Sequence, residues 1–494
     1  MATDLELKAI HTRRRYGNPN ENMLSHATIG VPVRVIDERV FMSLGILKVG
    51  AVLEQAGHEV DHLDLSGVKN YVEVASRYSG NPDVFAYTAT TPQLPAAIET
   101  RNALGGRAIL GGPHATLVHA AARKGSERAK RALAELIELF GTVVAGDGEK
   151  AIFAALRTGG MIDADNPMCD LWQSSQDFDS SPWPDRNLVD VDSYHYTVDG
   201  RRALSIIGQL GCPFGCHFCG GRNSAMLRRI RLRTPENIVA ELSSLHNTYG
   251  VDGMMFLDDE LNVNRGMTDL MRKIAATGID WRLRGFVKAE LFTEEQAEAM
   301  YAAGFRQLLC GFESGHPRIL KNINKKATVE DNTRMLRIAR THGLKVKALM
   351  SFGHPGETEE TILATRDWLL EEKPDDFDCT VITLYPGTPY WDESIDIGDG
   401  VYRYETHGDA LYSENVDFTQ EVAYYKGIPG EYKAFVWTDH LSRERLAALR
   451  DEVEDEVRRK LGIPYPTAVA ELSYEHSMGM ALPPNILRGS HAVN

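Results

Sequence analysis

Three of the chain's six cysteines stand close together, in the stretch "GCPFGCHFCGG" at 211–221. Cys212, Cys216 and Cys219 follow the spacing C-x3-C-x2-C. A zinc site normally uses four ligands, a disulfide would leave one thiol over, and a C-x2-C redox pair would leave Cys212 unexplained. Three thiolates on one short loop suit a cubic iron–sulfur cluster in which one iron has no protein ligand. We therefore interpret the stretch as an iron–sulfur site, with zinc as the alternative.

The residues around these cysteines fit the same interpretation. Phe218 would shield a cluster from water and so help to set its reduction potential. Gly220 and its neighbouring glycines let the backbone wrap closely around the sulfurs. His217, between two of the cysteines, is interpreted as a spacer.

The length and composition of the chain are those of a globular protein that is too long for one compact core. The chain has 494 residues, 43% hydrophobic and 25% charged, with a net charge of -15. Two or three domains are expected at this length. The acidic balance without a basic block argues against nucleic acid or an anionic membrane as the main partner. The sparse cysteines, the polar first twenty residues and the lack of a long apolar run predict a cytoplasmic protein in a reducing compartment.

Residues 1–154 are expected to form a doubly wound, Rossmann-like parallel sheet. Short apolar runs alternate with helical segments, which is typical of a parallel sheet covered on both faces. Ligands of such sheets lie beyond the C-terminal ends of the strands, where "LGGPHAT" and "AGDGE" stand. The expected strands of this part are 32–36, 59–65, 83–89, 107–112 and 142–149.

Three further segments follow. Residues 155–200 are rich in Asp, Ser and Pro and predict a linker. Residues 201–395 contain six βα units, consistent with a partial (β/α)6 barrel or a second open sheet, and helix-start signals stand at Thr234-Pro235, "TEEQ" and "TVED". Residues 396–494 are expected to be a mainly helical extension, with one amphipathic helix over 442–461. The expected strands of the second series are 203–208, 253–258, 281–286, 306–312, 345–350 and 378–384.

The cysteine motif at the end of the first strand of this series resembles the radical S-adenosylmethionine (SAM) superfamily. The resemblance implies a partial (β/α)6 barrel and a 4Fe–4S cluster held by Cys212, Cys216 and Cys219. It also implies that SAM chelates the fourth iron and is cleaved to a 5′-deoxyadenosyl radical. "FLDDE", "GFESG", "SFGHPGET" and "LYPGTP" stand where the family's later strands end.

The same resemblance suggests roles for individual residues. A carboxylate at Asp258 or Asp259 suits the SAM ammonium, and Glu313 suits the ribose hydroxyls. Lys288, Arg231 and Arg233 are candidates to steer the SAM carboxylate, although each is also typical of an ion pair. The remaining expected contacts are Ser314 and Gly353 to SAM, and Glu260, His354 and Tyr385 to the substrate as catalytic residues.

A doubly wound domain ahead of such a barrel resembles the cobalamin-binding subfamily. Gly111, Gly112 and Gly146 are the expected points of close approach to the corrin, and His114 is a weaker candidate that is also typical of a core histidine. The family's D-x-H-x-x-G motif is not present, because the corresponding place reads "VIDERVFMSLG". Cobalamin is therefore an uncertain cofactor.

The resemblance implies a radical SAM enzyme acting on a small molecule, in natural-product or antibiotic biosynthesis. Cobalamin-dependent C-methylation is the first expectation. The alternative is cobalamin-independent dehydration, deoxygenation or rearrangement of a sugar-like substrate, as in a lyase. An external one-electron reductant such as flavodoxin or ferredoxin is the expected partner, without nucleic acid or membrane.

Overall fold

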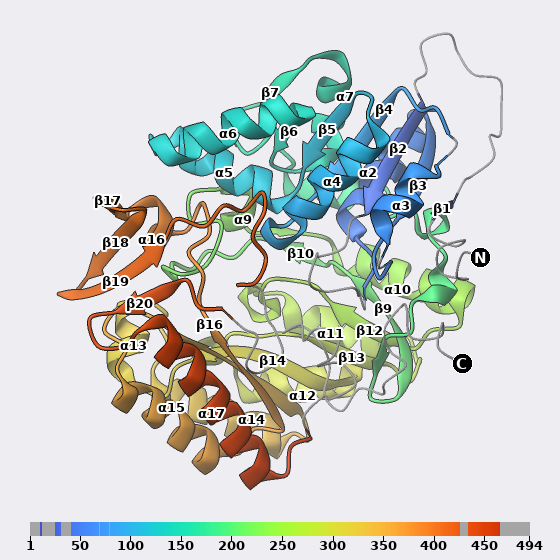
Figure 1. Ribbon diagram of the computed structural model, residues 1–494. Helices are drawn as coiled ribbons and strands as arrows, with labels where there is room; N and C mark the ends of the chain where they lie inside the picture. Colours follow the sequence, from blue (N-terminus) through green and yellow to red (C-terminus); the bar gives the residue numbers. More distant parts are fainter. Residues whose placement is uncertain are drawn as a thin grey trace.

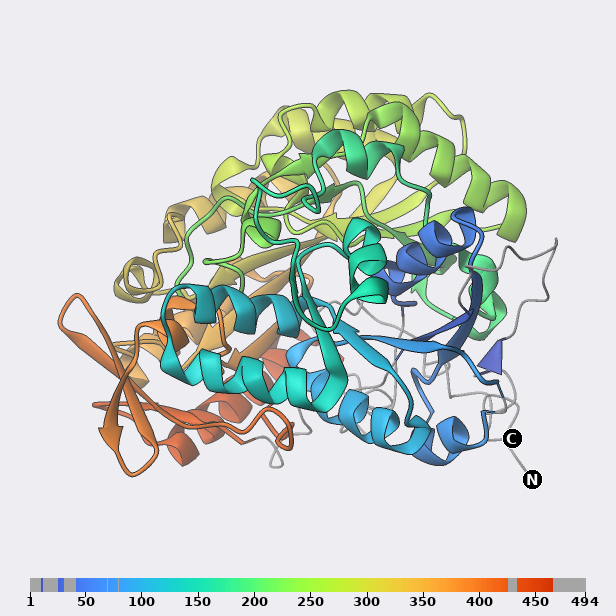
Figure 2. The same ribbon diagram turned by 90° about the horizontal axis from the view of Figure 1, so that it is seen from above.

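The computed structural model describes residues 10–11, 25–30, 41–68, 70–78, 80–424 and 433–464. Two large β-sheets with their helices lie one above the other, and a small antiparallel sheet projects beside them (Figure 1). The same arrangement is seen from above in Figure 2, where the small sheet stands at the left. None of the helices in these residues combines the length and the apolar character needed to cross a bilayer.

The N-terminal sheet has seven strands in the order β1-β3-β2-β4-β5-β6-β7. All neighbours pair in parallel except β1 and β3. The order, which starts in the middle and grows outward on both sides, is that of a doubly wound sheet, as predicted. The strands are β1 (Ile10–His11), β2 (Ser25–Gly30), β3 (Glu59–Asp64), β4 (Val84–Thr88), β5 (Ala108–Gly111), β6 (Gly141–Ala145) and β7 (Gly160–Asp163).

Helices cover both faces of this sheet because alternate strand residues are apolar on each side. Val84, Ile109 and Val144 pack on one face with α2 and α7, while Phe85 and Val143 pack on the other with α4 and α6. The helices of this part are α2 (Leu44–Gln55), α3 (Tyr71–Ser76), α4 (Leu94–Leu104), α5 (Pro113–Arg123), α6 (Glu127–Phe140) and α7 (Gly148–Arg157).

Two boundaries differ from the prediction. The strand expected at 32–36 lies outside the described residues, and the strand that pairs with β3 and β4 is β2, at Ser25–Gly30. The segment 155–200, expected as a linker, begins with the end of α7 and then supplies β7, which pairs with β6. The run Gly160–Asp163 is short and half-buried throughout, so it carries no clear apolar pattern. The rest of the segment contains only short elements, among them α8 (Ser175–Ser180) and β8 (Thr197–Val198).

The second sheet is curved and has the order β16-β15-β14-β13-β12-β9-β8. Its six parallel strands follow the six predicted runs in sequence order, so the sheet is a partial (β/α)6 barrel. Its strands are β9 (Arg201–Ile206), β12 (Gly253–Phe256), β13 (Arg282–Phe286), β14 (Phe305–Glu313), β15 (Lys345–Phe352) and β16 (Asp376–Val381). A short hairpin of β10 (Gln209–Leu210) and β11 (Arg231–Leu232) follows the first of them.

The barrel helices start where the sequence predicted. Thr234 caps α10 with Pro235 at its first position, and reciprocal capping boxes form at Thr293 with Gln296 and at Thr328 with Asp331. The helices are α9 (Ala225–Arg228), α10 (Pro235–Tyr249), α11 (Met267–Ala275), α12 (Glu294–Ala303), α13 (Pro317–Asn322), α14 (Val329–Thr341), α15 (Glu359–Glu372) and α16 (Pro389–Asp392).

The C-terminal extension is less helical than expected. Its helix α17 (Arg443–Leu461) is present, but before it lies a four-stranded antiparallel sheet. Alternating patterns such as "VYRYET" and "DALYSE" around the His407-Gly408 turn explain this sheet, since both turn residues have positive φ. Its strands are β17 (Ile395–Gly398), β18 (Val401–Thr406), β19 (Asp409–Glu414) and β20 (Val436–Thr438).

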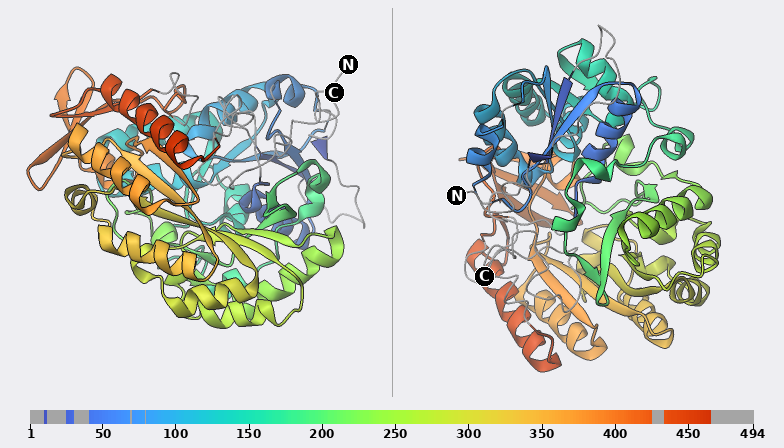
Figure 3. Two further views of the ribbon diagram at one scale, coloured as in Figure 1. Left: turned by 90° about the horizontal axis from the view of Figure 1, so that it is seen from below. Right: turned by 90° about the vertical axis from the view of Figure 1, so that its right-hand side faces the viewer.

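Helix α17 covers the open edge of the barrel at β16 (Figure 3, left). Glu454 accepts a hydrogen bond from the Cys379 N–H at 2.8 Å, and Arg450 donates to the Cys379 carbonyl at 2.9 Å. Arg458 donates to the Phe377 carbonyl at 2.5 Å. These buried side chains satisfy backbone groups that an edge strand would otherwise leave unpaired.

Candidate functional site

The three cysteines lie on the loop between β10 and α9. All three thiols are free. Burial raises the pKa of Cys212 to about 11, and the nearby thiol of Cys216 contributes to this shift. Burial also raises the pKa of Cys219, and the nearby thiols of Cys216 and Cys212 raise it further. Because such mutual effects act only over short distances, the structure brings the three cysteines together.

No group of three His, Cys, Asp or Glu side chains in the described part of the chain is arranged to hold a single metal ion. A cubic cluster places each thiolate on a different iron, so its ligands lie farther apart than those of one zinc ion. The arrangement of free, mutually close thiols on one loop therefore fits a cluster.

Asp258 and Asp259 hold the base of this loop. One carboxylate oxygen of Asp258 accepts a hydrogen bond from the Gly208 N–H at 2.6 Å, and one of Asp259 accepts from the Gly211 N–H at 2.9 Å. Burial raises the pKa of Asp258 to about 7. One or the other of these residues was predicted to bind the SAM ammonium, but each already has an oxygen that accepts a hydrogen bond from the backbone leading into the loop.

Glu260 differs from the two aspartates in its hydrogen bonding. Its Oε2 is buried without a hydrogen-bond partner in the described residues. Burial raises the pKa of Glu260 to about 7, and the charges of Lys325 and Lys288 oppose this rise. A buried unpaired acceptor is costly unless something fills it. Of the three acidic residues in "FLDDE", Glu260 is therefore the one best placed to meet a ligand.

Glu313 stands at the C-terminal end of β14 in a strained conformation. Its φ is 64°, in the left-handed region that residues other than glycine rarely adopt. Its carboxylate accepts from Lys325 Nζ at 2.9 Å and from Ser351 Oγ at 2.9 Å. Burial alone would raise the pKa of Glu313, but the charge and hydrogen bond of Lys325 hold it below the usual value. Strain of this kind is concentrated at functional sites.

The hydrogen bonds of Glu313 continue to His354. Ser351 Oγ lies 2.8 Å from His354 Nε2, and His354 Nδ1 lies 3.3 Å from the Tyr390 hydroxyl. Burial lowers the pKa of His354 to about 4, so its ring is neutral at pH 7. The ring also packs against Phe218 at 5.3 Å between centroids. His354 thus lies beside the cysteine loop, and its predicted role as a substrate contact stays a prediction.

Lys288, Ser314 and Tyr385 were also predicted as contacts of SAM or substrate, and each has a partner within the protein. Lys288 is buried, and its ammonium lies 4.3 Å from the centre of the Phe214 ring and 2.7 Å from Glu290. Ser314 is buried against Thr365 of α15. Tyr385 packs on Phe418 and Tyr424, two aromatic residues of the extension.

Two glycines of the prediction face other parts of the chain. A Cβ on Gly353, whose φ is 88°, would lie 3.0 Å from Val436 of β20. A Cβ on Gly220 would lie 3.5 Å from Leu117 of α5. Gly353 therefore lies against the extension. Gly220 lies where the cysteine loop contacts the N-terminal part of the chain.

The sequence analysis missed Lys325. It lies between Asn324 and Lys326, which both have positive φ. The pKa of Lys325 is raised well above its usual value: burial lowers it, but the charge of Glu313 outweighs that effect. A single lysine in "NINKKAT" has no recognisable spacing to other site residues. Only the folded structure shows that Lys325 donates to Glu313 at 2.9 Å and that its charge lowers the pKa values of Cys216 and Glu260.

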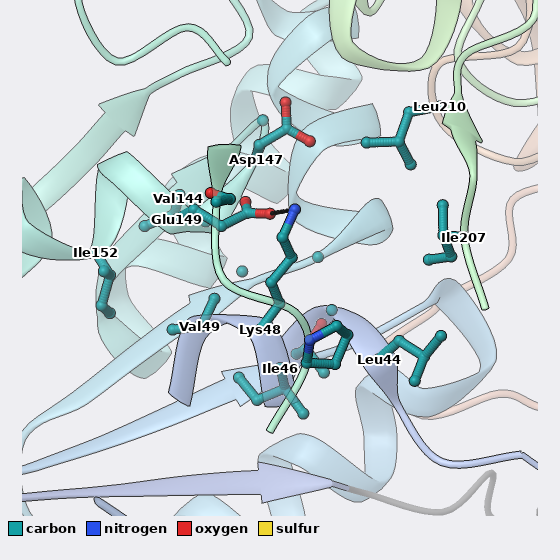
Figure 4. Close-up of a pocket in the computed structure, with 18 of the residues that line it drawn as sticks. Leu44, Ile46, Lys48, Val49, Val144, Asp147, Glu149, Ile152, Ile207 and Leu210 are labelled. Atoms are coloured by element: carbon teal, nitrogen blue, oxygen red, sulfur yellow. Dashed lines mark ion pairs between the residues drawn. The ribbon is translucent and has the colours of Figure 1, made fainter. Parts of the chain in front are cut away.

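A cavity of about 300 Å³ lies between the N-terminal sheet and the barrel. Ile46 and Val49 of α2 line it from the N-terminal part, and Ile207 and Leu210 line it from the segment that leads to Cys212 (Figure 4). The first residues of α2, α5 and α7 all border it. Helix N-termini carry partial positive charge and unpaired N–H groups, which favour an anionic ligand.

The predicted glycines Gly111, Gly112 and Gly146 line this cavity. Gly146 has a φ of 97°, and a Cβ there would come within 2.4 Å of the Ala164 backbone. Gly112, with a φ of 96°, is similarly close to Thr88 and Ala89. Gly111 is different, since its Cβ would meet nothing closer than 3.9 Å.

His114 does not line the cavity. Its ring is buried, with Nδ1 3.1 Å from the Thr91 hydroxyl and the Phe418 ring 6.3 Å away. Burial lowers the pKa of His114 to about 4. The structure therefore gives it the surroundings of a core histidine, which the sequence analysis named as its other interpretation.

Charged residues line one side of the cavity. Lys48 forms an ion pair with Glu149 at 3.1 Å, with Asp147 nearby (Figure 4). Asp147 pairs with Arg231, and burial raises the pKa of Asp147 to about 7 against the opposing charge of Arg231. Arg233 pairs with Glu241 at 2.6 Å. Arg231 and Arg233, candidates to steer the SAM carboxylate, are thus engaged in ion pairs.

Comparison with known proteins identifies the barrel. Residues 206–369, which include all three cysteines, match the family model of the radical SAM superfamily. The chain carries a radical SAM domain. This domain type binds a 4Fe–4S cluster and SAM, so the expectation of these two cofactors is confirmed.

Solved structures show that the fold extends beyond the radical SAM domain. The radical SAM methyltransferase TsrM from Kitasatospora setae superposes with a TM-score of 0.61 at 20% identity, over 90% of this chain and 89% of that one. The cobalamin-dependent SAM radical enzyme OxsB superposes with a TM-score of 0.52 at 13% identity. The match covers 75% of this chain and 55% of that one. The predicted order of a Rossmann-like part followed by a partial barrel is confirmed.

Curated relatives cover less of the chain. An uncharacterized methyltransferase of Pyrococcus horikoshii is 32% identical over 44% of this chain and 48% of its own length. An anaerobic magnesium-protoporphyrin IX monomethyl ester cyclase of Cereibacter sphaeroides is 27% identical over 64% of this chain and 53% of its own length. The chain thus spans about half the length of these relatives.

Proposed function

We propose that this protein is a radical SAM enzyme that uses cobalamin to methylate a carbon atom of a small molecule. The observation that carries the proposal is the cavity at the C-terminal edge of the N-terminal sheet, whose far wall is the segment leading to Cys212. A cofactor held there would lie next to the radical SAM site.

The residues near the cysteines suit SAM and its cluster. When bound, the cluster supplies the electron that breaks a sulfonium–carbon bond of SAM. We assign Glu260 to the SAM ammonium, because its free oxygen is buried, and Lys325 to the SAM carboxylate, because it adjoins both Glu260 and Cys216. Glu313, fixed by Lys325 and Ser351, faces the ribose in this assignment.

The cavity suits the nucleotide tail of cobalamin. Small-molecule sites usually measure about 300–1,000 Å³, so a cavity of about 300 Å³ holds the tail but not the corrin ring. The tail carries a phosphate, for which the N-termini of α2, α5 and α7 supply positive potential. Lys48 also borders the cavity, paired with Glu149. Gly112 and Gly146 let the backbone segments that border the cavity pack closely on Ala89 and Ala164. Cobalamin bound there would supply a carrier for the methyl group.

The names of several relatives support methylation. They include a bacteriochlorophyllide methyltransferase of Chlorobaculum tepidum, at 25% identity, and a hopanoid C-2 methylase of Rhodopseudomonas palustris, at 26% identity. One observation favours the alternative: a relative that covers 64% of this chain is named a cyclase. Radical chemistry without methyl transfer is therefore the second candidate. We place the small-molecule product in natural-product biosynthesis, as the sequence analysis expected.

Anaerobic purification after growth with cobalamin tests the cofactor. We expect a corrin absorbance in the wild-type protein and its loss in Gly111→Val, because that side chain enters the cavity without a backbone clash. Gly266→Val, outside the cavity, is the matched control. Equal corrin content in all three proteins would contradict the assignment of this cavity.

The reaction is tested with SAM whose methyl group is deuterated. Methylation of an unactivated carbon consumes two SAM molecules, one as methyl donor and one cleaved to 5′-deoxyadenosine. We expect a product that is heavier by the labelled methyl group, with both SAM products formed in equal amounts. Formation of 5′-deoxyadenosine alone, unaffected by added cobalamin, would favour the dehydration or rearrangement candidate.

A further inference from the structure

Positive charge surrounds the outer side of the cysteine loop in a protein whose net charge is -15. Arg228 donates to the Pro213 carbonyl at 2.9 Å, and Arg222 donates to the Phe214 carbonyl. Arg229 follows directly and is exposed, as is Pro213. We call the set Arg222, Arg228, Arg229, Lys321 and Lys326 the basic rim.

The other two members of the basic rim reach the loop from the barrel side. Lys321 and Lys326 are exposed and flank a turn in which Asn324 donates to the Gly215 carbonyl at 2.8 Å. The Ile323 carbonyl of this turn accepts a hydrogen bond from the His217 N–H at 2.9 Å.

The charges of the basic rim are not neutralised by neighbouring carboxylates. Within the described residues, none of its five members forms an ion pair, whereas the nearby Arg318 is paired with Asp409. Acidic groups near the loop include Asp392, which binds Asn223, and Glu393 near Tyr404. They also include Asp165, which accepts hydrogen bonds from the Ser224 hydroxyl and the Met226 N–H. Uncompensated charge of one sign steers an oppositely charged partner and lowers stability slightly, so it suggests a selected binding surface.

We propose that the basic rim is the docking surface for a small acidic protein that carries one electron. This inference rests on the proposed function, because a radical SAM site needs an external reductant. One electron leaves the carrier and enters the cluster held by Cys212, Cys216 and Cys219, and no atom is transferred. Docking at the rim places the carrier against Pro213 and Phe214, which directly follow the cluster ligand Cys212 in the sequence. Charge attraction between the rim and the carrier then raises the rate of encounter at low salt.

The test uses the triple variant Lys321→Glu/Lys326→Glu/Arg229→Glu, which leaves the loop-binding Arg222 and Arg228 in place. The control is Arg459→Glu, an exposed arginine on α17. Purified acidic flavodoxin is titrated anaerobically onto each protein with its cluster reconstituted. Formation of 5′-deoxyadenosine by the same preparations is then measured with reduced flavodoxin and separately with dithionite. We expect the triple variant to lose ~10–100-fold in flavodoxin affinity and flavodoxin-supported rate at low salt. Its dithionite-supported rate should stay within about twofold of wild type, since dithionite needs no docking surface.

Three results would overturn the proposal: unchanged flavodoxin affinity in the triple variant, an equal loss of the flavodoxin- and dithionite-supported rates, or tighter binding of an RNA oligonucleotide than of flavodoxin at the same surface. Absence of 5′-deoxyadenosine from the wild-type protein with dithionite would instead contradict the proposed function. The binding titration does not depend on that outcome.

Discussion

The hydroxyl of Tyr404 lies 3.0 Å from Nδ1 of His217, so the antiparallel sheet of the extension contacts the middle of the cysteine loop. The Tyr390 N–H also donates to the His217 carbonyl, at 3.3 Å. The extension is therefore a structural support of the cluster loop.

Tyr404→Phe should weaken cluster retention. Loss of one hydrogen bond costs about 1 kcal/mol, which corresponds to roughly fivefold faster iron release to a chelator. Tyr412→Phe in the neighbouring strand β19 is the control, since that hydroxyl binds Asp439 on the surface. Equal iron-release rates for the two variants would contradict the supporting role of Tyr404.

Asp258→Ala and Glu260→Gln should separate loop support from SAM binding. Asp258→Ala leaves the buried Gly208 N–H without its acceptor, at a cost of about 1–3 kcal/mol, and should lower iron content after reconstitution. Glu260→Gln should keep the cluster and lose SAM affinity. Iron analysis and equilibrium SAM binding measure the two effects. Normal SAM binding by Glu260→Gln at full cluster content would refute its assignment.

Lys325→Gln should destabilise the protein because it leaves Glu313 buried without its cation. Breaking a buried pair from one side costs about 3–5 kcal/mol. The double variant Lys325→Gln/Glu313→Gln should recover most of this stability without recovering SAM affinity. Urea unfolding and SAM titration check the two parts. Restored SAM binding in the double variant would show that Lys325 acts only through Glu313.

Glu357 should make stability depend on pH. Burial raises its pKa to about 7, although it accepts hydrogen bonds from Gly353, His354 and Thr361. A raised folded-state pKa favours the protonated carboxyl, so this stability is fully present below the unfolded pKa near 4.5 and is lost as pH rises through about 7.

We expect Glu357→Gln to reduce the fall in unfolding free energy between pH 5 and pH 8 by up to ~3 kcal/mol. Glu359→Gln, at an exposed residue of the same segment, is the control. Parallel pH profiles for wild type and Glu357→Gln would contradict the prediction.

Local signals predicted most of the barrel. Six apolar runs became β9, β12, β13, β14, β15 and β16, and the boxes at Thr293 and Thr328 began helices. Each of these elements is encoded by adjacent residues, because periodicity and capping act over one or two turns. The cysteine motif was likewise readable from its spacing.

The remaining features depend on residues far apart in the sequence. Lys325 meets Glu313, the last residue of β14, through the turn after α13. Tyr404 meets His217 only after the antiparallel sheet of the extension has formed. The reassignment from Asp258 and Asp259 to Glu260 depended on which carboxylates the backbone occupies. Such pairings have no local periodicity from which to predict them.

The support that Tyr404 gives to the loop bears on the order of events during synthesis. Tyr404 is made 187 residues after His217, which at about 5–20 residues per second leaves roughly 10–40 s in which the loop lacks this contact. Throughout that interval the three thiols belong to an incompletely folded chain and are open to oxidation or to iron-delivery proteins. The rate at which residues 218–404 are synthesised therefore sets how long the cysteine loop lacks this contact.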